Sequence, residues 1–320
     1  MLINLINVPE ALQDDRQCRS LIGLSLQSFK ILLDEFISCL EEARNKNRQR
    51  IPKKRRQRKP GGGRKFAIGS PENQLFFILF YLKNYPTYDV LAFTFNISRG
   101  CACESVKRLL AVLKHTLKNL KTLPKRMTDA PEDLIQVIEN IDHILIDATE
   151  RPIQRPKKPA RQKKNYSGKK GHHTVKNTIL SDKNKRLLII GNTVPGSQHD
   201  YSVLKEELNP EVDWFSSTEA SVDLGYQGIQ KDYSSAQNIH IPYKKPRKSK
   251  KNPDPQLTRK QKRENRQIGR VRVLVEHAIG GMKAFRVLTI RLRSHLTQLT
   301  DDFIFAAAGL WNLKNSFVVE

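Results

Sequence analysis

Three acidic residues lie next to apolar runs or within a basic segment, and together they could bind divalent metal ions. Asp147 follows the β-branched run HILI, Asp223 precedes Leu-Gly-Tyr, and Glu276 lies within RVLVEHAIGGMK, in the most basic third of the chain. Hard cations prefer carboxylate oxygens, and two such ions roughly 3.5–4 Å apart can clamp the attacking and leaving oxygens of a phosphodiester. The trio is therefore a candidate site for metal-dependent chemistry on nucleic acid.

Each of the three acids also has a purely structural explanation when it is considered alone. Asp147 and Asp223 are of a type that often forms turns, and Glu276 stands four positions after Arg272, the spacing of an ion pair on a helix. Asp200, before the helical segment YSVLKEEL, fits a helix N-cap better than a metal ligand. The metal-site hypothesis therefore depends on whether the fold brings the three acids together.

The composition favours a polyanionic partner. The 320 residues include 57 Lys and Arg against 32 Asp and Glu, which gives a formal net charge of +25. Self-repulsion of that size is usually relieved by a bound polyanion, so nucleic acid is the leading partner. An acidic membrane surface is the weaker alternative, because no basic amphipathic helix carries a Trp- and Phe-rich face and no apolar run is long enough to span a bilayer.

Residues 141–240 alternate between short apolar runs and polar turns, a pattern that predicts a sheet. A first strand is expected to end at Asp147, and a hairpin follows, with strands at 172–180 and 186–194 around the turn SDKNK. A helix is expected from Asp200, a fourth strand ends at Asp223, and NIHIPYKK forms a fifth strand. A long helical stretch over residues 257–285 contains Glu276.

This order of elements predicts an α/β fold, a ribonuclease-H-like mixed sheet flanked by helices. The hairpin makes the early strands antiparallel, and the later crossover favours parallel addition. Adjacent strands lie about 4.8 Å apart, so acids at neighbouring strand ends can share one ion, and a third acid must come from another element. The expected site therefore combines Asp147 and Asp223 at strand ends with Glu276 on a helix across the sheet.

A small all-α helix-turn-helix domain is predicted before the sheet. Helices are expected at residues 70–85, 87–95 and from 99 onward, with Ser70 and Ser98 as N-caps. Helix, short turn, helix is the order of a DNA-reading module, and its groove face would carry Arg99, Lys107 and Arg108. Any small helical bundle gives a similar pattern, so this motif alone leaves DNA reading open.

Four segments are predicted along the chain: an N-terminal helical segment (1–43), a basic flexible arm (44–69), the helix-turn-helix domain (70–135) and the ribonuclease-H-like domain (136–320). The four cysteines form no CxxC pair, which indicates reduced thiols. The N-terminus lacks the pattern of a signal peptide. The protein is expected in the cytoplasm, associated with the nucleoid, in a bacterial host, and in the nucleus of a eukaryotic one.

Five stretches in a fixed order resemble a known family. They are HILIDATERPIQRP, KKNYSGKKGHHTVKNTILSD, GNTVPGSQHDYSVLKEEL, VDLGYQGI and GRVRVLVEHAIGGMKAFRVL. The earlier segment FFILFYLKNYPTYDVLAFTFNISRGCACESVKRLL is similar to the helix-turn-helix region of the same family. The chain resembles insertion-sequence transposases of the DDE superfamily, in the branch related to Harbinger-type nucleases, from about the basic arm to Arg293.

The resemblance implies, position by position, that Asp147, Asp223 and Glu276 are catalytic and bind the metal. It also implies two Mg²⁺ or Mn²⁺ ions, cutting and joining of DNA, binding to terminal inverted repeats and target DNA, and a homodimer or larger synaptic assembly. Arg272 and Lys283 fit the family's spacing on the last helix, where they would hold phosphates beside the metals. The tyrosine that many relatives carry on that helix is replaced here by Gly269.

Two other functions remain compatible with the sequence. A domesticated transposase that regulates by binding DNA without cutting it would keep the helix-turn-helix and the basic arm but lose an acid, whereas this chain retains all three. A metal-dependent nuclease without strand transfer would have the same motifs, so the sequence does not separate it from a transposase.

Overall fold

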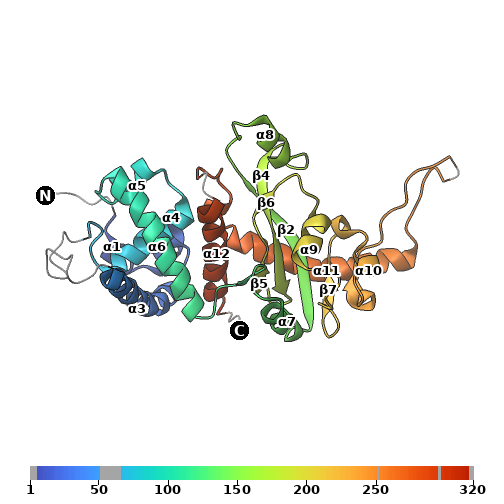
Figure 1. Cartoon of the computed structure of the whole chain (residues 1–320), viewed down its shortest axis with the longest axis horizontal. Coiled ribbons are helices and arrows are strands. Elements are labelled where there is room, and N and C mark those ends of the chain that lie inside the picture. The colour runs from blue at the N-terminus through green and yellow to red at the C-terminus, as the bar shows by residue number, and fades with distance from the viewer. Residues whose placement is uncertain (1–5, 51–65, 251, 295–296, 317–320) are drawn as a thin grey trace. The chain divides into compact units, whose positions relative to one another are not determined.

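The computed structural model describes residues 6–50, 66–250, 252–294 and 297–316, which divide into two compact units (Figure 1). The helical unit contains the chain up to Leu123, a short segment that begins at Met282 and ends at Ile290, and the C-terminal helix. The sheet unit contains the chain from Pro124 to Gly281 together with residues 291–293. Each unit has its own buried core and is described separately below.

The helical unit opens with α1 (Val8–Ala11), α2 (Asp15–Ile22) and α3 (Leu26–Arg50). The sequence predicted that the third of these helices ends near Glu42, but it continues to Arg50. The added segment RNKNRQR contains no Gly or Pro, and Arg, Lys and Gln are good helix formers, so nothing in it stops the helix. Part of the predicted basic arm is therefore helical, and its residues 51–65 lie outside the described residues.

Three further helices are α4 (Pro71–Asn84), α5 (Tyr88–Thr94) and α6 (Arg99–Asn119). Each begins at a hydroxyl N-cap, as predicted for Ser70 and Ser98. The side chains of Ser70, Thr87 and Ser98 each accept a hydrogen bond of 3.2 Å from the backbone N–H three residues later. Helices α5 and α6 contact each other across the turn between them, which gives the predicted helix-turn-helix order.

The C-terminal helix α12 (Thr297–Lys314) belongs to the helical unit, where it packs against α6. Its Gly309 faces Leu117 and Leu123 so closely that an added Cβ would lie 3.0 Å and 3.2 Å from their methyl carbons. The short helix η4 (Arg286–Leu288) contacts α4 in the same unit. The contacts of the structure thus group α12 with the helical unit, whereas the sequence analysis assigned this segment to the domain at 136–320.

The sheet unit is built on a mixed sheet of eight strands among the described residues. The strands are β1 (Lys125–Arg126), β2 (His143–Pro152), β3 (Tyr166–Ser167), β4 (His172–Asp182), β5 (Leu187–Ile190), β6 (Val194–Pro195), β7 (Glu219–Ser221) and β8 (Ile239–His240). The main strand order is β1-β5-β4-β2-β7-β8, so β2 lies inside the sheet. It pairs antiparallel with β4 and parallel with β7, and the predicted hairpin is the antiparallel pair of β4 and β5.

Helices cover the sheet and complete its core. They are α7 (Pro131–Glu139), α9 (Asp200–Glu207), α10 (Ile229–Asp232) and α11 (Arg259–Met282), with the 3-10 turn η2 (Leu224–Tyr226). Helix α8 (Pro159–Asn165) and the 3-10 turn η3 (Ala236–Asn238) have no buried residue. Ile144 and Ile146 of β2 pack in one hydrophobic cluster with Leu134 of α7 and Leu204 of α9. At about 25 cal/mol per Å² of apolar surface, burial of such side chains is the main force that holds these helices to the sheet.

The observed architecture confirms the predicted fold class, a mixed α/β sheet flanked by helices and preceded by a small helical domain. Over the described residues, no helix combines the length and the apolar character that crossing a membrane requires.

The packing of Gly309 gives a test of the helical unit. Replacing Gly309 with Val should lower the free energy of unfolding by about 1–3 kcal/mol, because the new methyl groups would overlap Leu117 and Leu123. The measurement is chemical denaturation of the full chain, followed by circular dichroism. Gly100→Val in α6 is the matched control, since an added Cβ there meets nothing within 4 Å. Equal stability of the two variants would contradict the placement of α12.

Candidate functional site

Asp147 lies in the middle of β2 rather than at its end, which corrects the sequence prediction. The antiparallel pairing with β4 continues to Pro152, so the strand persists beyond the acid. The parallel pairing with β7, in contrast, ends at Leu145 opposite Ser221. Asp147 and Asp223 each lie two residues beyond this last pair, Asp147 still on β2 and Asp223 just past the end of β7, so both acids follow the point where the pairing ends.

Asp223 leaves β7 and starts the turn η2. Its Oδ1 accepts a hydrogen bond of 2.6 Å from the backbone N–H of Leu224, which fixes the carboxylate at the beginning of the turn. About 42% of the side chain is exposed, so one side of this acid faces solvent. The turn role that the sequence suggested for Asp223 and a role in a metal site are thus compatible.

Arg272 of α11 joins two of the three acids. Its Nη1 lies 3.3 Å from Oδ1 of Asp223, and its Nη2 lies 4.0 Å from Oε1 of Glu276 on the same helix. The arginine side chain is only 14% exposed, and its buried Nε has no hydrogen-bond partner among the described residues. The guanidinium thus lies against the acids, and the ion-pair spacing of Arg272 and Glu276 in the sequence corresponds to a contact in the structure.

Burial raises the pKa of the Asp147 carboxyl above its ordinary value. The nearby negative charges of Asp223 and Asp200 act in the same direction. A hydrogen bond from the Ala148 backbone N–H at 2.8 Å and the positive charge of Arg272 oppose the shift without cancelling it. Asp147, Asp223, Asp200 and Arg272 therefore interact electrostatically in one place, and added positive charge there would favour the ionised form of Asp147.

The donor set fits a divalent cation in its chemistry. Asp147, Asp223 and Glu276 are carboxylates, the ligands that Mg²⁺ and Mn²⁺ prefer. In the described ranges, no group of three or more His, Cys, Asp or Glu is arranged closely enough to hold a metal ion. The positive charge between Asp223 and Glu276 is that of the Arg272 guanidinium.

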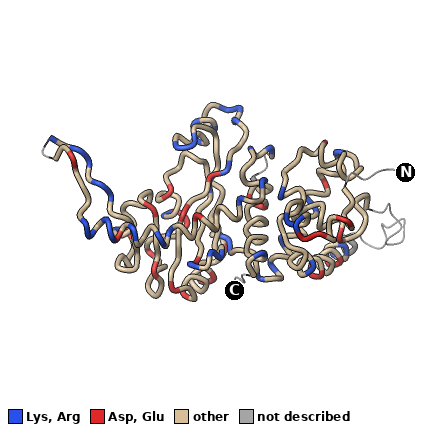
Figure 2. The backbone as a smooth tube through the Cα atoms, turned by 180° about the vertical axis from the view of Figure 1, so that it is seen from behind, with Lys and Arg blue, Asp and Glu red and all other residues tan. Residues whose placement is uncertain are grey.

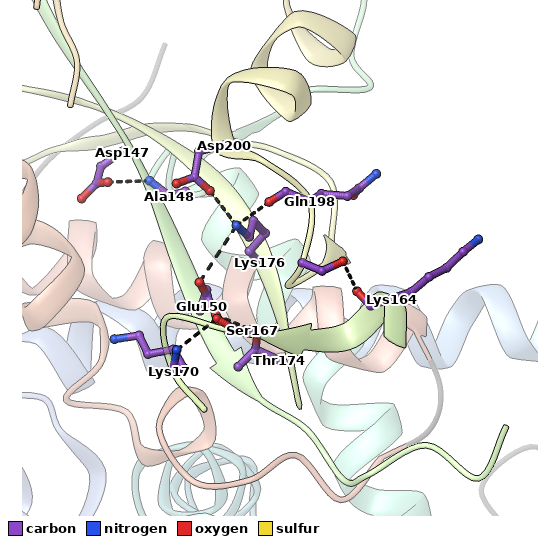
Figure 3. A network of polar contacts seen from close by, with 11 residues as sticks. Asp147, Ala148, Glu150, Lys164, Ser167, Lys170, Thr174, Lys176, Gln198 and Asp200 are labelled. Atoms are coloured by element: carbon purple, nitrogen blue, oxygen red, sulfur yellow. Dashed lines mark hydrogen bonds and ion pairs between the residues drawn. The ribbon is translucent and has the colours of Figure 1, made fainter. Parts of the chain in front are cut away.

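Asp200 does not have the N-cap role that the sequence suggested. It is the first residue of α9, the N-cap position is His199, and no side chain caps this helix end. The Asp200 Oδ1 instead lies 2.7 Å from Nζ of Lys176 on β4 (Figure 3). The partner comes from a strand 24 residues away, which local sequence patterns do not indicate.

Lys283 lies just beyond the end of α11 at Met282 and groups with the helical unit. The predicted helical face that would join Lys283 to Arg272 and Glu276 is therefore interrupted, because the helix stops one residue before the lysine. The phosphate-binding role of Lys283 stays a prediction.

The three basic residues predicted for the groove face of α6 have different surroundings. Arg99 is 70% exposed and lies 3.5 Å from Asp89, and Lys107 pairs with Glu104 at 2.9 Å on the same exposed face. Arg108 is partly buried, with its guanidinium 4.2 Å from the Phe66 ring centroid and bonded to the Gln74 side chain at 3.2 Å. Arg99 and Lys107 remain available to DNA, whereas Arg108 supports the helix packing.

Further basic segments lie in the sheet unit. Lys and Arg dominate α8 and the segment between β8 and α11 (Figure 2), with the residues PARQKKN in α8 and KKPRKSK at 244–250. The side chains of these stretches are mostly exposed and their runs contain no acid. They are candidate contacts for a nucleic-acid backbone, which is recognised mainly by charge.

A cavity of about 620 Å³ lies at the other end of β2 and β7. Inside it, the buried His143 bonds to Glu219 and to Ser221, at 2.8 Å each. The rings of His143 and His240 stack at 5.7 Å. None of the three predicted acids lines this cavity, so it is separate from the candidate metal site.

Comparison with known proteins gives two family matches. Residues 146–312, more than half of the chain, match the model of the DDE superfamily endonuclease, and residues 68–119 match the helix-turn-helix of DDE superfamily endonuclease. The chain is 28% identical over 302 residues to a probable transposase for insertion sequence element IS702 from Microchaete diplosiphon, covering 93% of this chain and 94% of that protein. No solved structure gives a significant match.

The raised pKa of Asp147 gives a prediction for stability. Asp147→Asn should raise the free energy of unfolding in metal-free buffer at neutral pH by about 1 kcal/mol, or roughly 2–4 °C in Tm, because it removes a buried charge beside other acids. A raised pKa makes ionisation costly in the folded state, so the gain should shrink as pH falls and wild-type Asp147 takes up its proton.

The measurement is a set of thermal unfolding curves in EDTA between pH 4 and 8. Asp232→Asn is the matched control, because a hydrogen bond from Tyr201 and an ion pair with Lys205 hold the pKa of Asp232 below its ordinary value. This control should not gain stability at neutral pH. A destabilised Asp147→Asn variant would contradict the electrostatic account of the site.

The surroundings of the α6 residues give a prediction for DNA binding. Arg99→Ala and Lys107→Ala should each weaken binding to duplex DNA and reduce the slope of log affinity against log salt by about 1, the effect of one lost phosphate contact. Arg108→Ala should instead lower stability by about 1 kcal/mol through its lost ring and amide contacts. Fluorescence anisotropy across a salt series measures the slopes, with the exposed Lys118→Ala at the far end of α6 as control. An unchanged slope for both Arg99→Ala and Lys107→Ala would exclude this face.

Proposed function

Because the chain belongs to the DDE superfamily endonucleases, we propose that it is a DNA transposase that binds the terminal inverted repeats of a mobile element. It would cut DNA at these ends and join them to a target through metal-dependent phosphodiester chemistry. The probable transposase from Microchaete diplosiphon supports this proposal, because its similarity extends over nearly the whole of both chains.

The observation that carries the proposal is the set of charges around Arg272. One guanidinium contacts Asp223 and Glu276, and its positive charge also acts on Asp147. The charge of Arg272 thus acts on three acids, which come from β2, from the turn after β7 and from α11, in a site where phosphodiester chemistry would need positive charge. Their carboxylate chemistry and the shared influence of Arg272 support Asp147, Asp223 and Glu276 as the catalytic, metal-binding residues.

When bound, Mg²⁺ or Mn²⁺ would supply Lewis-acid stabilisation of the attacking and leaving oxygens, and two ions are expected. Asp147, Asp223 and Glu276 would hold the ions. In the first step, water attacks the phosphorus at the element end, the P–O bond to the 3′ oxygen breaks, and a free 3′-OH is released. In the second step, the freed 3′-OH attacks a phosphodiester of the target DNA and displaces the 3′ oxygen of the target strand.

DNA binding is assigned to both units. The match of residues 68–119 to the family's helix-turn-helix supports α6 as the element that reads the terminal repeats, through Arg99 and Lys107. The exposed basic stretches of α8 and residues 244–250 would contact phosphates of the bound DNA. Two ends must be brought together for joining, so a homodimer or larger synaptic assembly is part of the proposal.

The proposal is tested by incubating the full chain with duplex DNA that carries candidate terminal repeats, in Mg²⁺ or Mn²⁺. Wild type should nick the repeat ends and join them to target DNA, as resolved on denaturing gels. Asp223→Asn and Glu276→Gln should lose at least about a hundredfold in the nicking rate, because each removes a carboxylate from the charged site. Asp254→Asn, an exposed acid outside the site, should retain the wild-type rate.

The outcomes separate the competing functions. Binding to the ends without nicking or joining in either metal would overturn the transposase proposal in favour of a regulator that binds DNA. Nicking without joining would favour a metal-dependent nuclease that lacks strand transfer. Inverted repeats beside the coding region and short target duplications in the genome would favour mobility.

A further inference from the structure

We propose that the cavity beside β8 binds an unpaired nucleotide, whose base stacks on Tyr243 and is read by glutamine side chains. The inference goes beyond the proposed function, because none of the three acids lines this cavity. It rests on that function only in expecting DNA as the source of the nucleotide.

The cavity is formed entirely within the sheet unit, by β8, the loop that follows it, α10 and α11. Its volume of about 620 Å³ falls within the range of roughly 300–1,000 Å³ that is typical of small-molecule sites. Ile239 of β8 and the pair Ile268 and Val271 of α11 supply apolar lining. A ligand with a flat, weakly polar part would bury that part here.

Two aromatic side chains, Tyr243 and His240, line the cavity. Tyr243 is 46% exposed, and Asn265 of α11 holds its backbone, accepting from the Tyr243 N–H at 2.8 Å and donating to its carbonyl oxygen at 3.0 Å. The ring of His240 stacks on the buried His143 with 5.7 Å between centroids, which holds His240 in place. Unpaired bases stack on aromatic rings of this kind, so the cavity offers a base a platform in a fixed position.

Glutamine side chains supply groups that can read a base. Gln227, Gln237 and Gln267 line the cavity, and none of their side-chain amides is bonded to another of the described residues. Gln230, in contrast, donates to the carbonyl oxygen of Ile239 at 2.7 Å and supports the wall. An amide can donate and accept at once, and a Gln side chain matches the N6 and N7 atoms of adenine.

The charged groups of the cavity fit the other parts of a nucleotide. Lys244 lines the cavity and supplies positive charge for one phosphate. Glu264 lines it as well, and a carboxylate can accept from the exocyclic amino group of a base. A hydrogen bond with Glu264 raises the pKa of Tyr243, so the phenol that offers the stacking surface stays neutral at physiological pH.

Two walls of the cavity continue into segments that carry residues of the charged site. Val271 directly precedes Arg272 on α11, and Gln227 follows the turn η2, which begins at Asp223. Four residues of chain span at most about 14 Å, so the cavity wall at Gln227 is no further than that from Asp223. DNA bound at the acids would therefore pass close to the cavity.

The experiment compares two duplexes in buffer with EDTA, one fully paired and one with a single unpaired adenine, by competition fluorescence anisotropy on the full chain. The ratio of the two affinities cancels the backbone contacts that both duplexes make. Wild type should prefer the unpaired adenine at least about fivefold, and Tyr243→Ala or Gln267→Ala should bring the ratio to about 1. Tyr166→Ala should keep the preference, since Tyr166 is similarly exposed at 48% in the same unit but does not line the cavity.

A second arm identifies the source of the nucleotide. Isothermal titration calorimetry compares dAMP with deoxyribose 5-phosphate, which lacks the base. Binding of dAMP that Tyr243→Ala abolishes supports a free nucleotide as an occupant, whereas a duplex preference without dAMP binding supports DNA alone. Circular dichroism checks that each variant is folded, and Gln267→Ala decides the outcome if Tyr243→Ala does not fold.

The inference is overturned if wild type shows neither the duplex preference nor dAMP binding. It is also overturned if dAMP and deoxyribose 5-phosphate bind equally, or if the two tyrosine variants behave alike. Because these measurements contain no metal, they are independent of the nicking assay. Nicking and joining without a duplex preference would leave the proposed function standing, and a preference without nicking would overturn that function alone.

Discussion

Repulsion between carboxylates is the constraint on which the sheet unit depends. Two negative charges 4 Å apart repel by about 4 kcal/mol at an effective dielectric constant of 20, so a cluster of acids needs cations close by. The structure supplies two from its own side chains. Arg272 contacts Asp223 and Glu276, and Lys176 contacts Asp200. Each of these cations is largely buried, so neither acts as a mobile counter-ion in solvent.

The sheet brings these charges together because β2 has a different partner on each side. Its parallel pairing with β7 ends at Leu145, so Asp147 and Asp223 both lie beyond the point where this pairing ends. Its antiparallel pairing with β4 continues, which keeps Asp147 on a rigid strand and places Glu150 opposite Lys176. A site on strands and helices holds its geometry more closely than a site on loops, which suits chemistry that depends on the spacing of charges.

Local chemistry explains which features were predictable from the sequence. The N-caps at Ser70 and Ser98, the β4–β5 hairpin and the fold class follow from residues near one another in the chain, and the structure confirms them. The end of a strand depends on a distant partner, so Asp147 was wrongly placed at a strand end. The pairing of Lys176 with Asp200 and the packing of α12 against α6 are long-range contacts, which no local pattern specifies.

Arg272 was expected from the sequence to hold DNA phosphates, and in the structure its guanidinium contacts Asp223 and Glu276. The guanidinium has five N–H donors, and one contact each to Asp223 and Glu276 leaves donors that could also meet a phosphate. In the proposed function, Asp223 and Glu276 would hold the divalent cations, and the Arg272 guanidinium beside them would supply further positive charge where the DNA phosphates would lie.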